Sequence, residues 1–335
     1  MLHRLTLTPI FAVLAMAGCS DDGAGPVADS RPPTTDHAPT DQAPPDGPAG
    51  DRSIQWDITV DPPVTLSVAT WNVKNFFDEN DDPAHQDDLP TAAEVKAKIK
   101  ALGAALRQLK ADVLALQEVE NRQLLDRLVS EELSSLQYKH VRLLEGNDVR
   151  GIDVALLSRY PVPKAISHVK DVFKGVPPDT QNYGFSRDCL EATIEPAAGR
   201  RLILLINHLR ASDGTNYQES VARREAQAQR VREIADATLA AHPDANLAVV
   251  GDLNDTPDSK TIQLLRDGAP ALRDLLTLVP ADQRYTHAKK SQLDYILAAP
   301  GLDSDLIQGS VRADHATVFG DTSDHFPVLA RFKLE

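Results

Sequence analysis

The chain of 335 residues contains little sulfur and less positive than negative charge. Only two cysteines occur, Cys19 and Cys189. If Cys19 is modified, no intramolecular disulfide can form, and stability must come from the hydrophobic core. Lysine and arginine number 35 against 49 acidic residues, which gives a formal net charge of −14. This acidic balance is the opposite of the basic surface of a tight, non-specific DNA-binding protein. The 42% of hydrophobic residues is enough for one large α/β domain or two small ones.

A long apolar run near the start of the chain is also lacking. The run at residues 10–17 is too short to span a bilayer, and the small residues that follow it are typical of a signal peptide. Ala17-Gly18-Cys19 resembles a bacterial lipobox, with Met16 where that motif prefers leucine. We therefore predict a lipoprotein-type signal peptide over residues 1–18, with a lipid attached to Cys19. Such a protein is extracytoplasmic, anchored to a bacterial membrane in the periplasm or at the cell surface. The alternative is an ordinary secretory signal with an incidental cysteine.

Residues 19–63 consist largely of Asp, Pro, Thr, Ala and Gly. Such a segment buries too little apolar area to offset the entropy of ordering it, so we predict a disordered acidic tether. Nine aspartates against Arg31 and Arg52 place half of the formal negative charge in this tether. Trp56 and Ile58 near its end are candidates for packing at the domain edge. Residues 64–335 contain no internal linker and predict one domain, which is itself acidic.

The pattern of this domain alternates strands with helices at first and strands with strands later. The capping box Thr91-Ala92-Ala93-Glu94 begins a helix whose apolar face recurs to Leu109. Further helices are predicted near residues 124–129, 220–239 and 261–265. Strands are predicted over residues 66–73, 112–116, 141–144, 152–157, 189–194, 202–206, 248–250, 293–297 and 326–332. This order favours a mixed rather than a purely parallel sheet.

Six of the predicted strands carry a polar residue at one end. These residues are Asn72, Glu118, His208, Asp252 with Asn254, Asp294, and Asp324 with His325. Each alone has a structural explanation, such as a turn in which Asp or Asn bonds its own backbone. Six coincidences of one kind are much rarer than one shared site. A carboxylate and an amide two residues apart at a strand end suit a hard cation and an oriented water.

The acidic loop at residues 78–88 is a different case, because its acids alternate as in a calcium-binding loop. Pro83 stands where an EF-hand needs glycine, and no glutamate closes the loop. A solvated surface loop is therefore the better interpretation. The same test rejects an EF-hand from Asp252 onward, where Pro257 falls at the glycine position.

Seven segments of the chain resemble the endonuclease/exonuclease/phosphatase superfamily, the DNase I-like proteins, and occur in the order typical of it. They are ATWNVKNFF, LALQEVE, RGIDVALLSRYP, LLINHLRAS, VVGDLNDTP, QLDYIL and TSDHFPVLARF. The resemblance runs from Val64 to the C-terminus and is strongest to secreted bacterial members. It implies an α/β (α+β) fold, a four-layer α/β/β/α sandwich. In this fold two mixed β-sheets pack face to face with helices outside.

The resemblance also implies a metal site and the chemistry of phosphate-ester cleavage. Glu118, Asn72 and Asp324 would hold Mg²⁺ or Mn²⁺, with Ca²⁺ as a third option, through the oxygen ligands that hard cations require. The ion would bind a phosphate oxygen and neutralise the charge on the leaving oxygen.

The remaining polar residues would act on water and phosphate. Asp252 would accept the proton of the attacking water, with Asn254 orienting that water. His325, oriented by Asp294, would donate a hydrogen bond to the phosphate, and so would His208.

Three further residues flank strands where the family often places substrate contacts: Arg150, Asp153 and Arg187. A surface ion pair explains them equally well. Cys189 falls in a strand pattern and is interpreted as a small buried apolar side chain.

The sequence thus predicts a divalent-metal-dependent phosphodiester hydrolase, a nuclease that cleaves nucleic acid by direct attack of water. It is expected to be a monomer that touches the membrane through its lipid. The alternative within the superfamily is a phosphatase or a lipid phosphodiesterase acting on sphingomyelin or an inositol phosphate. A third hypothesis is a surface binding module whose site has lapsed. The loops at residues 171–186 and 210–218, which would select the substrate, carry no recognisable signature.

Overall fold

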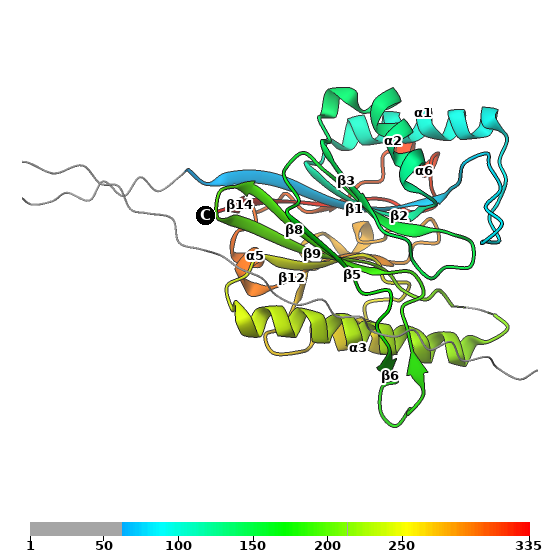
Figure 1. Ribbon diagram of the computed structural model, residues 1–335. Coiled ribbons are helices and arrows are strands. Elements are labelled where there is room, and N and C mark those ends of the chain that lie inside the picture. Colours follow the sequence, from blue (N-terminus) through cyan, green and yellow to red (C-terminus); the bar gives the residue numbers. More distant parts are fainter. Residues whose placement is uncertain (1–61, 213) are drawn as a thin grey trace, which may run out of the picture. The chain divides into compact units, whose positions relative to one another are not determined.

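A computed structural model describes residues 62–212 and 214–335 of the chain, drawn in colour in Figure 1. The predicted signal peptide, Cys19 and the acidic tether up to residue 61 lie outside the described residues. Among the helices of the described residues, none is both long and apolar enough to cross a membrane.

Two six-stranded sheets form the centre of the domain. The first sheet has the strand order β13-β14-β1-β2-β4-β3. Its strands are β13 (Arg312–Ala313), β14 (Val328–Leu334), β1 (Val64–Phe76), β2 (Val113–Val119), β4 (Asp153–Ser158) and β3 (His140–Leu143). Strands β1 and β2 are parallel, whereas the other neighbours in this sheet are antiparallel.

The second sheet has the strand order β11-β12-β10-β9-β8-β5. Its strands are β11 (Arg273–Asp274), β12 (Asp294–Ala298), β10 (Leu247–Asp252), β9 (Arg200–His208), β8 (Cys189–Ala197) and β5 (Lys164–Ser167). Here β9 and β10 are parallel and the other pairs antiparallel, so both sheets are mixed, as predicted.

The two sheets pack face to face because their strands alternate apolar side chains between two faces. In β10, Ala248 and Val250 face the core shared by both sheets, whereas Leu247 and Val249 face the helices on the outside. In β1, Val68 lies in the shared core. Burial on both faces explains why these strands read as continuous apolar runs in the sequence.

Helices cover the outer face of each sheet. The first sheet is covered by α1 (Ala92–Leu109), α2 (Arg122–Glu132) and the short α6 (Thr317–Gly320), and the second by α3 (Tyr217–Ala241) and α4 (Lys260–Arg266). Figure 1 shows α1 and α2 on one side of the sheets and α3 on the other. The predicted four-layer α/β/β/α sandwich is therefore confirmed.

The capping box predicted for α1 is present. The Thr91 hydroxyl accepts a hydrogen bond from the Glu94 backbone, and the Glu94 carboxylate accepts one from the Thr91 backbone N–H at 2.8 Å. Each contact satisfies a backbone donor that the helix itself leaves unpaired.

The short strands β5, β11 and β13 were not predicted, and two further local features differ from the prediction. The last strand begins at Val328 rather than at residue 326, because Pro327 has no N–H to donate to the sheet. The segment 171–186, which has no signature in the sequence, contains a small hairpin of β6 (Phe173–Lys174) and β7 (Asn182–Tyr183). The remaining short elements are α5 (Pro300–Ser304) and the 3₁₀ turns η1 (Ser134–Leu136), η2 (Leu275–Leu278) and η3 (Ala281–Gln283).

Candidate active site

The predicted polar residues come from strand ends of both sheets. In the second sheet, Asp252 at the end of β10 is level with His208 of β9 on one side and with Asp294 of β12 on the other. In the first sheet, Asn72 of β1 and Glu118 of β2 lie on neighbouring parallel strands. Register therefore places three of the five side by side in one sheet, and the packing of the sheets adds the other two.

Asn72 connects the two sheets through a single amide group. Its Nδ2 donates to Oε1 of Glu118 at 2.9 Å and to Oδ2 of Asp252 at 3.0 Å. Asn72 and Asp252 are each only 1% exposed. The two carboxylates therefore meet at one point, and a hydrogen bond across the sandwich fixes their spacing.

His325 lies near the same Asp252 oxygen that Asn72 bonds. Its Nδ1 is 2.8 Å from Oδ2 of Asp294, and its Nε2 is 3.8 Å from Oδ2 of Asp252. Burial opposes protonation of this imidazole, but the charges of Asp294 and Asp252 outweigh it and raise the pKa of His325 to about 10. At neutral pH the ring is an imidazolium, and Asp294 fixes its orientation.

Burial raises the pKa of Asp252 to about 7, with a further contribution from the charge of Asp294. His208 lies beside it, with Nε2 at 3.6 Å from Oδ2 of Asp252. Burial and the nearby charge of Arg187 hold the pKa of His208 well below its usual range, so its ring is neutral. One buried carboxylate thus faces one charged and one neutral imidazole.

The backbone at the strand ends is shaped to present these groups. Glu118 adopts a φ of 63°, and the register between β2 and its neighbours shifts at this position. A bulge of this kind redirects a side chain that regular pairing would bury in the sheet. Asn254 has a φ of 55°, and its N–H donates to Oδ1 of Asp252 at 2.9 Å.

A family model for the endonuclease/exonuclease/phosphatase family matches residues 67–273, well over half of the chain. The chain belongs to this family. Its members are hydrolases that act on phosphoester bonds and generally use divalent metals. No curated protein sequence matches the chain.

Solved structures share the fold at low sequence identity. The human Nocturnin catalytic domain with a bound sulfate anion is 20% identical, covers 82% of this chain and 95% of its own, and has a TM-score of 0.56. Truncated TDP2 of Caenorhabditis elegans is 18% identical, with 80% and 98% covered and a TM-score of 0.54. A family member from Beutenbergia cavernae is 20% identical, with 81% and 72% covered and a TM-score of 0.56. At these identities the similarity establishes the fold alone.

Two of the predicted metal ligands are oriented differently from the expectation. Asn72 presents its nitrogen to the carboxylates, because its Oδ1 accepts the N–H of Lys74 at 2.9 Å. Oδ2 of Asp324 is 2.9 Å from Nζ of Lys74 in an ion pair. Glu118 is thus the predicted ligand whose carboxylate shares a hydrogen-bond donor, Nδ2 of Asn72, with Asp252.

The donor chemistry of this site nevertheless fits a divalent cation of the kind that the family uses. Glu118 and Asp252 bring two carboxylates onto one amide, and Asp294 adds a third acid behind His325. Oxygen donors of this kind suit Mg²⁺ or Mn²⁺, and a cation would relieve the repulsion between the acids. Separately, Asp252, Asp294 and His325 each offer a ligand atom within 4.8 Å of one another.

Two predicted substrate contacts, Arg187 and Arg150, meet near the site. Nε of Arg187 is 2.7 Å from Oδ2 of Asp148, and the charges of Glu118 and Asp252 act on this guanidinium. Nε of Arg150 is 3.2 Å from the other oxygen of Asp148. Asp148 therefore holds both arginines, of which Arg187 is buried and Arg150 is the more accessible.

Asp153, the third predicted substrate contact, is enclosed by the protein. Its side chain is buried, with 1% of the residue exposed, and Oδ1 accepts the N–H of Gly146 at 2.7 Å. A carboxyl group enclosed in this way fixes the loop that carries Arg150. Cys189 is fully buried in β8, as predicted.

Three residues near the site were missed in the sequence. The ring of His287 is 4.9 Å from that of His325, and its Nε2 is 3.9 Å from Oδ2 of Asp324. Lys74 pairs with Asp324, and Lys98 lies close enough to Glu118 for that charge to affect its pKa. Of these three residues, only Lys74 lies in one of the segments that resemble the family. His287 lies in a loop and Lys98 in a helix, and no sequence pattern around either residue indicates a role in the site.

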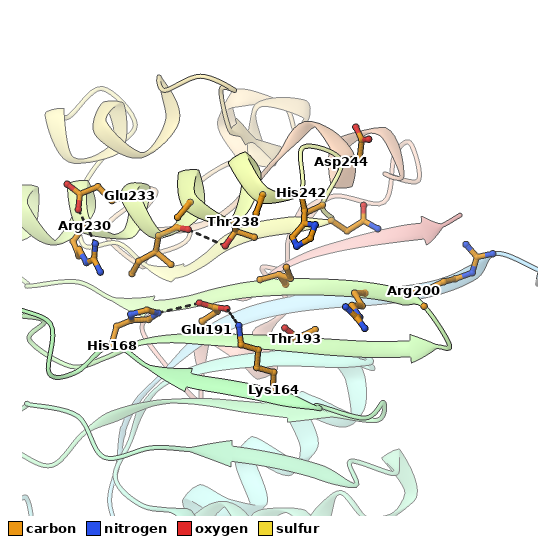
Figure 2. Close-up of a pocket in the computed structure, with 18 of the residues that line it drawn as sticks. Lys164, His168, Glu191, Thr193, Arg200, Arg230, Glu233, Thr238, His242 and Asp244 are labelled. Carbon is orange, nitrogen blue, oxygen red and sulfur yellow. Dashed lines mark hydrogen bonds and ion pairs between the residues drawn. The ribbon is translucent and has the colours of Figure 1, made fainter.

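A cavity of about 690 Å³ lies elsewhere, between α3 and the outer face of β8 and β9. Figure 2 shows that charged side chains in this cavity pair with one another. Oε1 of Glu191 is 3.0 Å from Nζ of Lys164, and Oε2 is 3.4 Å from Nε2 of His168. None of the strand-end residues lines it, so cavity size does not locate the catalytic chemistry here.

Proposed function

We propose that this protein is a divalent-metal-dependent phosphodiester hydrolase, and that its substrate is nucleic acid. One observation carries the proposal: the buried Asp252 carboxylate lies between the Asp294-His325 pair and the Asn72-Glu118 pair. A structural ion pair alone would not account for three acids and two imidazoles gathered where the strand ends of both sheets meet. Perturbed acids and oriented imidazoles in one place are typical of catalytic sites.

The residues divide the chemistry between proton transfer and charge stabilisation. Asp252, with a pKa raised to about 7, is a base of suitable strength for the proton of an attacking water. Asn254 holds that carboxylate in place through its backbone N–H. His325 and the neutral His208 direct N–H donors toward a phosphate whose negative charge increases in the transition state. A cation would neutralise charge on the phosphate and the leaving group, and Glu118 would hold it. Asn72 through Oδ1 and Asp324 through its carboxylate would join Glu118 once their contacts with Lys74 are exchanged for the ion.

The test is hydrolysis of bis-p-nitrophenyl phosphate by the purified domain with Mg²⁺, Mn²⁺ or EDTA. We expect activity that EDTA abolishes, and losses of about 10³-fold or more in Asp252→Asn and His325→Ala. The conservative change Asp267→Asn, at an exposed ion pair, is the matched control and should retain activity. Absence of hydrolysis with every cation on every phosphate ester would overturn the proposal. A surface binding module with a lapsed site predicts that outcome.

The substrate class is tested by comparing plasmid DNA, RNA, sphingomyelin and inositol phosphates under the same conditions. If the protein cleaves nucleic acid, it should hydrolyse DNA or RNA and should release little product from sphingomyelin or inositol phosphates. Hydrolysis of sphingomyelin with plasmid left intact would favour the lipid phosphodiesterase alternative, which shares the same catalytic residues.

The proposed location is outside the cytoplasm, with the protein held as a monomer by a lipid on Cys19. The support for the lipid anchor is the apolar run at residues 10–17 together with the lipobox-like sequence that ends at Cys19. Labelled palmitate should be incorporated by the unmodified protein and not by Cys19→Ala in a bacterial host. Incorporation by both would contradict this location.

A further inference from the structure

A second cavity of about 520 Å³ lies between α1 and the segment that connects β1 to it. It adjoins the candidate active site through Asn75, whose backbone N–H donates to Oε2 of Glu118 at 2.8 Å. Asn75 itself lines the cavity, as does Lys98 on α1. The cavity therefore lies next to the Glu118 carboxylate, and a substituent of a phosphate held by a cation at Glu118 would extend toward it.

One wall of the cavity is apolar and partly open to solvent. It is formed by Phe77, Leu89, Pro90 and Val95. Phe77 and Val95 are buried beneath, but Leu89 is 57% exposed and belongs to a small set of large apolar side chains that face solvent among the described residues. An apolar wall of this kind, in a cavity within the usual size range of about 300–1,000 Å³, suits a flat organic ring.

The charges of the cavity are arranged by sign. Lys98 occupies the side next to Glu118, where its Nζ donates to Thr322 O at 2.8 Å. An ammonium has three donors, so this contact leaves others for a substrate oxygen. Asp88 and Glu94 are acceptors at the exposed rim. Burial lowers the pKa of Lys98 to about 8, which leaves it charged at neutral pH.

We infer that this cavity is a nucleoside subsite, which takes the base of a nucleotide next to the scissile phosphate. The base would lie on Leu89 and Pro90, its N–H donors (the ring N3–H in thymine) would face Asp88 and Glu94, and Lys98 would contact the phosphate. The inference rests on the proposed hydrolysis of nucleic acid and adds where that substrate is recognised.

Other substituents of a phosphate ester fit this cavity less well. Lys98 repels the quaternary ammonium of phosphocholine, which is also much smaller than the cavity. The two acids at the rim would lose hydration against an acyl chain. A second phosphate group at the rim would be repelled by the same acids.

The test compares substrates with and without a base. Thymidine 5′-(p-nitrophenyl phosphate), its 3′ isomer and methyl p-nitrophenyl phosphate are assayed with the unmodified protein, Leu89→Ser and Leu89→Tyr. In Leu89→Ser, the ratio of kcat/KM between at least one thymidine ester and the methyl ester should fall about fivefold. The change should lie mainly in KM, and Leu89→Tyr should restore the ratio or raise it.

Val172→Ser is the matched control. Val172 is 74% exposed and directly precedes β6, on the hairpin that Figure 1 shows beyond α3, on the side of the domain away from α1. It should leave every ratio unchanged. Binding of thymidine 5′-monophosphate in the presence of Mg²⁺, measured by calorimetry, is a readout independent of turnover and should weaken by the same factor in Leu89→Ser.

The outcomes separate the subsite from the proposed function. If the unmodified protein hydrolyses all three esters but neither ratio nor binding changes in Leu89→Ser, the subsite is wrong and the hydrolase stands. A preference for p-nitrophenylphosphorylcholine that depends on Leu89 would assign the cavity to choline instead. If nothing is hydrolysed and thymidine 5′-monophosphate does not bind, both inferences fall.

Discussion

The chemistry of single residues in this site depends on how a few buried groups share charge. His325 is held as an imidazolium because Asp294 and Asp252 outweigh the effect of burial. Asp294 meets Nδ1 of the ring at 2.8 Å and is itself fully buried, so it does not contact a phosphate. Its effect on catalysis is therefore exerted through the orientation and charge of His325.

Asp294→Asn is expected to lower kcat on bis-p-nitrophenyl phosphate by about 10²- to 10⁴-fold, because an amide can fix the wrong tautomer of the imidazole. The substitution keeps the size of the side chain, so the protein should remain folded. Circular dichroism and the thermal midpoint check the fold. A kcat close to that of the unmodified protein would show that the pair is structural.

A second residue-scale prediction concerns Asp153 and the pH dependence of stability. Burial raises the pKa of Asp153 to about 8 in the folded protein, against about 3.9 in an unfolded chain. The folded state then binds the proton more tightly, so the contribution to stability is full below about pH 4 and is lost as the pH rises toward 8.

Urea unfolding of the unmodified protein and Asp153→Asn at pH 5 and pH 8 measures this effect. The stability of the unmodified protein relative to the variant should fall by about 2 kcal/mol between the two pH values, less than the full linkage because buried sites relax. Subtracting the free energy of unfolding of Asp153→Asn removes the contribution of the other titrating groups, which both proteins share. An equal difference at both pH values would mean that Asp153 is ionised throughout.

At the scale of elements, the end of β10 depends on Gly251. Its φ is 129°, and a Cβ at this position would lie 1.9 Å from the backbone oxygen of Asn207 on β9. Both the conformation and the close approach therefore require glycine immediately before Asp252.

Gly251→Ala is expected to destabilise the protein by about 3 kcal/mol or more and to displace Asp252 from its partners. Gly199→Ala is the matched control, since Gly199 has a φ of 75° but no atom within 4 Å of the place that an added methyl group would take. It should cost about 1 kcal/mol and leave kcat unchanged. Urea unfolding and the rate on bis-p-nitrophenyl phosphate separate the two effects. An equal loss of stability in the two variants would show that the positive φ alone, and not the close approach to Asn207, requires glycine at position 251.

The long elements could be predicted from sequence because local pattern determines them. The apolar strands around residues 202–206 and 248–250 and the capping box at Thr91 are examples. The bulge at Glu118 could not be predicted, because pairing with β1 and β4 creates it. The segment 171–186 lacks an apolar alternation, and it is tied to α3 by Arg230, which bonds Asp171, and by Gln227, which bonds the carbonyl of Gly184.

The site likewise has features that local sequence predicts and features that depend on contacts between distant segments. Asp252, Asp294, His208 and Glu118 follow short apolar runs or precede them, so the sequence alone indicates a shared edge. The orientation of Asn72 and the pairing of Lys74 with Asp324 depend on hydrogen bonds between distant segments, and no local pattern encodes them.

At the scale of the whole molecule, a cation should connect catalysis to stability. The Glu118 and Asp252 carboxylates repel each other in the folded state, and an ion that binds only there stabilises that state by mass action. We expect 10 mM Mg²⁺ to raise the thermal midpoint by about 2–4 °C over EDTA.

Glu118→Gln should lose this shift, whereas Glu131→Gln, at an exposed residue of α2, should retain it. Differential scanning fluorimetry measures the shift without any substrate. The same shift in Glu118→Gln as in the unmodified protein would place the cation at another site.

The amide of Asn72 bonds two acids, Glu118 and Asp252, that belong to different sheets of the sandwich. Turnover should therefore depend on how the two sheets are aligned with each other. A small slide of one sheet past its partner would part Glu118 from Asp252 while every ladder within each sheet stayed intact. Hydrolysis should therefore cease at lower urea concentrations than the loss of ellipticity. The rate of hydrolysis therefore reports on the alignment of the two sheets in the protein interior.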